Sequence, residues 1–97
     1  NIVLSPQQVI TSVADSYSVK LSDLVSKKRT QSIVLPRQVA MFLMKERLNM
    51  SLKEIGTHFG GRDHSTVKYA VDSIREQLKN DDFLQDMVSK ITKKTFG

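Results

Sequence analysis

Apolar residues recur at helical spacing along most of the chain, in stretches separated by short polar segments. The clearest stripe occupies positions i, i+1, i+4, i+5 and i+8 of one segment: Val9, Ile10, Val13, Ala14 and Tyr17. This spacing is typical of an amphipathic helix, whereas strands alternate with a period of two. We count six such segments and assign no strand. The pattern therefore predicts an all-α protein.

Capping residues mark where several of these helices begin. Ser5 is followed three residues later by Gln8, and Ser51 by Glu54, and both pairs have the spacing of a capping box. Asp63 precedes another apolar-periodic segment and can cap it through its carboxylate. The sequence therefore predicts helices that start after each of these three caps.

The longest apolar segment begins near Pro36. A proline ring is tolerated in the first turn of a helix, so we expect this helix to start there. Every residue from Val39 to Met44 is apolar, and Asn49 is a suitable C-terminal stop. A helix that is apolar on most faces is usually surrounded by others. We expect this one to lie at the centre of the fold.

The other helices should pack around the central one. We expect a short helix near residues 20–25, a second after Ser51, a long one after Asp63 and a last one after residues 80–82. The side chains expected to face the core are Leu21, Leu24, Val25, Leu52, Ile55, Phe59, Val67, Ala70, Val71, Ile74, Leu78, Phe83, Leu84, Met87, Val88 and Ile91.

Residues 51–79 combine a short helix, a turn and a longer helix. Gly60 and Gly61 supply the turn, since glycine readily adopts the left-handed backbone conformation that ends a helix. This is the pattern of a helix-turn-helix, whose second helix presents its first residues to base edges in the major groove. The polar residues at that position are Asp63, His64, Ser65, Thr66 and Lys68. Helix-turn-helix shapes also occur in proteins that bind no DNA, and Asp63 alone would be only a cap.

Basic residues are concentrated in the middle of the 97-residue chain, which has a formal net charge of +5. Between Lys20 and Lys68 there are ten basic and four acidic residues, whereas the remainder has five basic and six acidic ones. Residues 26–32 have no apolar side chain and contain three consecutive cations, so we expect an exposed basic loop. This distribution points to a polyanionic partner, most simply nucleic acid. A solvated surface that happens to be basic is the alternative.

Residues 60–71, GGRDHSTVKYAV, closely resemble the signature of the DnaA family of bacterial chromosomal replication initiators, within its C-terminal DNA-binding domain. Residues 24–29 with 36–41, and residues 52–61, also resemble that family at its spacing. The resemblance covers nearly the whole chain. It implies one compact six-helix domain over residues 1–97, Trp-repressor-like and containing a helix-turn-helix. This domain would bind DnaA boxes in double-stranded DNA at the replication origin.

The resemblance also implies a role for individual residues. In the family, the recognition helix enters the major groove while an arginine of the basic loop enters the adjacent minor groove. By position, Arg29 would be the minor-groove arginine, and the base-facing residues would be Asp63, His64 and Ser65. The residues expected at the DNA backbone or the groove edge are Lys27, Lys28, Arg37, Gln38, Lys45, Lys53, Thr66 and Lys68.

Three positions depart from the commonest family pattern. Ser65 and Gln31 stand where threonine and arginine are frequent, and Leu35 stands where a basic residue can occur. Ser65 keeps the hydroxyl but lacks the methyl group that could pack against a thymine methyl. We therefore expect the same site with slightly altered contacts and fewer backbone cations in the loop.

Catalysis within this chain is not expected. There is no cysteine, and His58 and His64 are six residues apart, whereas spacing of three to five would suit a metal better. Gly60-Gly61 lacks the Lys-Ser/Thr of a phosphate-binding loop. We therefore expect no metal and no cofactor in this chain. The family resemblance places ATP in an ATPase domain upstream of Asn1.

Other partners are weighed against DNA in the same way. A helix-turn-helix transcriptional regulator is the alternative function, and RNA is disfavoured because no RNP-type strand is present. Residues 1–19 contain no Lys or Arg, contrary to a membrane-surface helix, and Asn1–Leu4 show no signal peptide. The missing initiator methionine suggests a fragment of a longer initiator. We expect a monomer in the bacterial cytoplasm, at the nucleoid.

Overall fold

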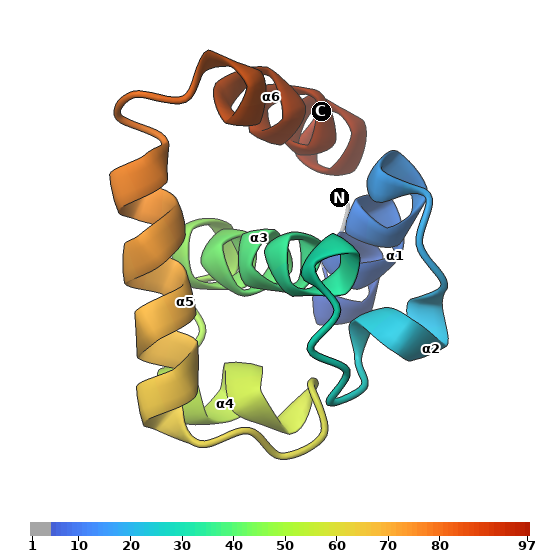
Figure 1. Cartoon of the computed structure of the whole chain (residues 1–97), viewed down its shortest axis with the longest axis vertical. Helices are drawn as coiled ribbons and strands as arrows, with labels where there is room; N and C mark the ends of the chain where they lie inside the picture. Colours follow the sequence, from blue (N-terminus) through green and yellow to red (C-terminus); the bar gives the residue numbers. More distant parts are fainter. Residues whose placement is uncertain (1–4) are drawn as a thin grey trace.

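The computed structural model of the chain describes residues 5–97, which form six helices and no strand (Figure 1). The helices are α1 (Pro6–Tyr17), α2 (Leu21–Leu24), α3 (Gln31–Leu48), α4 (Leu52–Thr57), α5 (His64–Gln77) and α6 (Asp82–Phe96). The predicted all-α class is confirmed. The expectation that Asn1–Leu4 contain no signal peptide concerns residues outside the described part of the chain.

Helix α3 is the centre of the fold, as predicted. It runs through the middle of the molecule, with α5 across one end and α1 beside the other (Figure 1). Val39, Ala40 and Met44 on α3 are fully buried. Helix α6 packs mainly on α1, and α4 packs under α3 and α5. None of the helices within residues 5–97 is long and apolar enough to cross a membrane.

The predicted caps are confirmed. Ser5 with Gln8, and Ser51 with Glu54, form complete capping boxes, in which each serine hydroxyl and each partner side chain accepts a backbone N–H. Asn49 ends α3 in the left-handed conformation, with φ of 54°. These local signals determine helix ends because they satisfy backbone groups that the helix itself leaves unpaired.

The predicted start of the third helix near Pro36 was wrong. Helix α3 begins at Gln31, so Pro36 is its sixth residue. The first turn is closed by a hydrogen bond from the Ile33 N–H to the Thr30 carbonyl (2.8 Å), and the Ile33 side chain is buried. Burial of an isoleucine contributes about 1.5–3 kcal/mol, which is comparable to the cost of about 3 kcal/mol for a proline inside a helix. The basic loop is correspondingly shorter than residues 26–32.

Two side chains expected in the core lie at the surface. Leu21 is 41% exposed and Phe83 is 77% exposed. Helix α2 has only four residues and buries Leu24 alone. In α6 the buried residues are Leu84 and Ile91. Phe83 is the residue before Leu84, and adjacent residues point about 100° apart around a helix. Phe83 therefore lies beside the buried stripe and not within it.

The junction between α4 and α5 requires glycine at specific positions. A Cβ on Gly56 would collide with the backbone carbonyl oxygen of Arg62. Helix α4 can therefore approach the following turn this closely only because residue 56 has no side chain. Gly60 and Gly61 have φ of 77° and 76°, as the predicted turn requires. The helix-turn-helix predicted for residues 51–79 is therefore present, with α4 and α5 as its two helices.

Candidate nucleic-acid interface

The basic loop and the turn before α5 form one continuous surface. Both lie at the lower end of the molecule as drawn in Figure 1. Arg62 Nη2 donates to the Ser26 carbonyl oxygen (3.3 Å). A Cβ on Gly60 would lie 3.6 Å from the Val25 carbonyl oxygen and 3.7 Å from Lys27 Cε. Two segments more than thirty residues apart in the chain are thus in direct contact.

A single cavity of about 310 Å³ connects the basic loop with the start of α5. The residues that line it are Arg29, Val34, Arg37, Gln38, Met41, Arg62, Thr66, Tyr69 and Ala70. Arg29 comes from the loop and Thr66 from α5, so the structure brings these two predicted site residues to one hollow. A polyanion lying across it would meet both segments.

The start of α5 presents polar groups to solvent. His64, Ser65 and Thr66 are all exposed. The Asp63 carboxylate accepts the Thr66 backbone N–H (2.8 Å) and so caps the helix, as predicted. This hydrogen bond lowers the pKa of Asp63, and the adjacent His64 adds to the effect. The N-terminus of a helix also favours a nearby anion such as a phosphate.

The lowered pKa of Asp63 predicts a pH-dependent cap. The ionised cap stabilises the fold above the unfolded pKa of about 3.8, and this contribution disappears as the pH falls through the lower folded value. Asp63→Asn keeps a capping side chain that does not titrate. We expect the thermal midpoints of the two proteins, measured by circular dichroism from pH 7 to 2.5, to converge below pH 4. Parallel curves would show that the cap is not linked to this titration.

Arg37 was expected at the DNA backbone, and the structure shows that its side chain is used mainly within the protein. The side chain is only 4% exposed. Its Nε donates to the Leu24 carbonyl (3.0 Å), Nη1 to that of Lys28 (2.7 Å) and Nη2 to that of Asp23 (3.3 Å). Three of the five N–H groups of the guanidinium are thus already used within the protein. Arg37 instead holds the segment that leads to Arg29.

The remaining predicted cations differ in whether their side chains already have partners within the protein. Lys27, Arg29 and Lys53 are exposed. Three others already have partners: Lys28 Nζ lies 2.9 Å from Asp23 Oδ1, Lys45 Nζ donates to the Met50 carbonyl (3.3 Å), and Lys68 Nζ lies 2.6 Å from Asp72 Oδ2. Gln38 is half-buried in the wall of the cavity. Of the predicted cations, the three that are exposed and have no carboxylate or carbonyl partner within residues 5–97 therefore lie in the loop and near the start of α4.

Two residues of this surface were not predicted as site residues. Arg62 lines the cavity and bonds the loop, and Tyr69 lines the same cavity with 70% of its surface exposed. Arg62 lies inside the 60–71 motif, which was a usable signal. Tyr69 follows Thr66 by three residues and so shares its helix face, a relation that spacing alone could have revealed.

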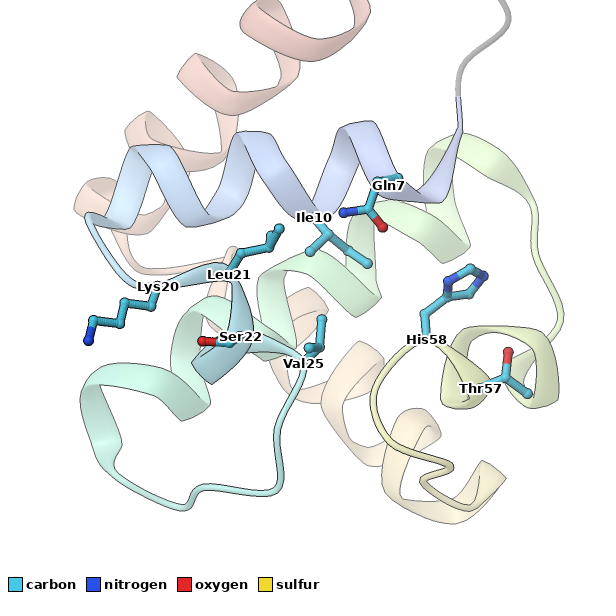
Figure 2. A pocket seen from close by; sticks show the side chains of 8 residues that line it. All are labelled: Gln7, Ile10, Lys20, Leu21, Ser22, Val25, Thr57 and His58. Carbon is cyan, nitrogen blue, oxygen red and sulfur yellow. The ribbon is translucent and has the colours of Figure 1, made fainter.

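A second, larger cavity lies away from these residues. It has a volume of about 790 Å³ and opens between α1, α2 and the end of α4 (Figure 2). Its lining residues are Gln7, Ile10, Lys20, Leu21, Ser22, Val25, Thr57 and His58. His58 belongs to this cavity, whereas His64 begins α5, so the two histidines belong to different features of the surface. Within residues 5–97, no group of three His, Cys, Asp or Glu side chains is placed to hold a metal.

These features define the chain as a helix-turn-helix domain with a basic loop beside its second helix. A family model described as bacterial dnaA protein helix-turn-helix matches residues 6–74. The chain belongs to this family.

Relatives agree with this assignment. The chain is 48% identical over 82 residues to the chromosomal replication initiator protein DnaA of Thermomicrobium roseum, covering 84% of this chain and 18% of that protein. Identity to the proteins of the same name is 46% over 82 residues in Limosilactobacillus reuteri (84% and 19% covered) and 43% over 97 aligned positions in Methylacidiphilum infernorum (94% and 21%). The chain thus spans about a fifth of the length of these relatives.

A solved structure shows the same fold. The crystal structure of a DNA replication initiation factor superimposes with a TM-score of 0.83 at 33% identity, covering 94% of this chain and 28% of that one. The agreement extends over nearly all of the described helices.

Proposed function

We propose that this domain binds double-stranded DNA sequence-specifically at DnaA boxes and serves the initiation of chromosomal replication. The observation that carries the proposal is the shared cavity, because Arg29 and Thr66 line one hollow beside the exposed start of α5. A duplex lying there meets the basic loop and the helix tip together. The name of the relatives, chromosomal replication initiator protein DnaA, supports the same function.

The two segments would read different grooves. His64 and Ser65 would bond base edges in the major groove, and Asp63 has a second carboxylate oxygen that could accept from a cytosine amino group. Arg29 would enter the adjacent minor groove, where a narrow A·T-rich groove attracts arginine through its negative potential. Because the minor groove distinguishes A·T from T·A poorly, finer discrimination falls to the helix tip.

The other residues would fix the position of the domain on the duplex. The residues proposed to contact the DNA backbone or the groove edge are Lys27, Lys28, Gln38, Lys45, Lys53, Thr66 and Lys68. Lys28 and Lys68 would exchange their present carboxylate partners for phosphate. Arg37 would contribute indirectly, by holding the loop in place. Such contacts set orientation and affinity without reading sequence.

We further infer that residues 1–97 act as one binding domain without a catalytic step or cofactor of their own, as a monomer on a single box. The overall positive charge of +5 suits a binding role on a polyanion at the bacterial nucleoid.

Fluorescence anisotropy with a consensus DnaA-box duplex and its scrambled counterpart tests the proposal. At about 150 mM salt we expect the box to bind tighter by on the order of a thousandfold. Repeating both titrations over a salt series should give log–log slopes of about −0.9 for each phosphate neutralised. Equal affinities for the two duplexes would refute sequence-specific recognition, and a slope near zero would refute phosphate contact.

A further inference from the structure

The recognition helix α5 carries one cation that is held by a carboxylate. Lys68 Nζ lies 2.6 Å from Asp72 Oδ2, and both side chains are about half exposed or more, at 64% and 48%. Lys68 follows His64 by four residues and Ser65 by three, so it shares a helix face with the proposed base-reading residues. A cation next to the proposed DNA surface is thus neutralised within its own helix.

The carboxylate of Asp72 is fixed in this position by a second contact. Its Oδ1 accepts from Arg75 Nη1 (3.2 Å), and Arg75 Nη2 donates to Glu46 Oε2 on α3 (3.1 Å). Both Asp72 oxygens are therefore used, one by Lys68 and one by Arg75. The hydrogen bond from Lys68 lowers the pKa of Asp72. The tie between Arg75 and Glu46 does not depend on Asp72 and would survive its replacement.

We propose that Asp72 is a specificity-determining residue, which neutralises Lys68 on the DNA-facing side of α5 and thereby weakens binding to duplexes that lack the box. The inference rests on the DNA-binding function proposed above. Non-specific binding comes from cation–phosphate contacts, whereas specific binding also has base contacts. Neutralising one cation therefore weakens the non-specific complex more than the specific one.

The difference between the two complexes follows from their geometry. At the box, the base contacts of the helix tip and Arg29 set the register, so Lys68 can reach only the phosphate that this register offers. On other sequences the domain is free to shift until most of its cations meet phosphates. A released Lys68 would therefore add its full effect to non-specific binding and only part of it to specific binding.

Asp72→Asn tests this directly in anisotropy titrations on the scrambled and box duplexes. We expect the variant to bind the scrambled duplex about threefold tighter or more at 50 mM salt, with a slope steeper by up to about 0.9. The ratio of box to scrambled affinity should fall at least about twofold. The double variant Lys68→Ala with Asp72→Asn should return the scrambled affinity to near the wild-type value.

Glu76→Gln is the matched control. It removes the same charge from the same helix, but Glu76 pairs with Lys79 (3.0 Å) one turn farther from the helix tip. We expect it to leave the affinity ratio unchanged. Thermal midpoints by circular dichroism would check that each variant is folded.

Two results overturn the inference while leaving the proposed function intact. In the first, Asp72→Asn and Glu76→Gln have the same effect on the scrambled duplex. In the second, Asp72→Asn tightens both duplexes equally, so that their ratio does not change. A wild-type domain that shows no preference for the box would instead refute the proposed function, and this inference with it.

Discussion

Replacing Arg29 or His64 by alanine should weaken binding to the box duplex by about 1–3 kcal/mol, roughly 5- to 150-fold, with a smaller loss on the scrambled duplex. Each change removes a group that we propose to contact bases. Arg29 is exposed in the loop and His64 is exposed at the first turn of α5, so the fold should be unaffected. Anisotropy titrations of both variants on both duplexes, at matched salt, measure the two losses.

Lys27→Ala provides the control for these variants. It removes an exposed cation from the same loop, and we propose only a backbone contact for it. It should therefore weaken both duplexes alike and reduce the salt slope by about one unit. If Arg29→Ala behaves in the same way as Lys27→Ala, then Arg29 contacts phosphate and does not read the minor groove.

Arg37→Ala should lower the free energy of unfolding by about 2–4 kcal/mol, because the buried carbonyl group of Leu24 and the partly buried ones of Lys28 and Asp23 lose their donor. For a domain of this size, the thermal midpoint should fall by more than about 10 °C. Urea unfolding followed by circular dichroism gives the free energy. Box binding should also decline, since the loop that carries Arg29 loses its support.

Two comparisons make the Arg37 result decisive. Arg37→Lys keeps the charge, but a compact ammonium group cannot reach the three carbonyl groups that the planar guanidinium bonds. We therefore expect this variant to be less stable than the wild type as well. Arg29→Ala removes a nearby exposed cation and should unfold like the wild type. A fully stable Arg37→Ala protein with a salt slope reduced by about one unit would restore the original expectation that Arg37 contacts phosphate.

Features set by local chemistry were predictable from the sequence. The caps at Ser5, Ser51 and Asp63 satisfy backbone groups within three residues of themselves, so their residue types are sufficient evidence. Likewise, a pair of glycines between two predicted helices indicates a left-handed backbone, as Gly60 and Gly61 have here. The helix-turn-helix was found from these signals and from the spacing of buried residues in α5.

Features set by contacts between distant segments were not predictable in this way. The true start of α3 depends on how Ile33 packs in the folded protein, and the burial of Arg37 depends on carbonyl groups that lie 9 to 14 residues earlier in the chain. Phe83 is of a residue type that is usually found in the core, but it lies just outside the buried stripe of α6. The motif indicated the region of the proposed site, although it could not show which of its cations already have partners.

The hydrogen bond from Arg62 to Ser26 keeps the basic loop and the turn before α5 at a fixed separation. If one duplex contacts both segments, as proposed, their separation determines the length of the recognised site. One inserted base pair would rotate the two halves of the site by about 35° relative to each other. A rigid domain cannot follow that rotation, so spacing would be recognised together with sequence. The same rigidity spares the complex the entropy of ordering a loose loop.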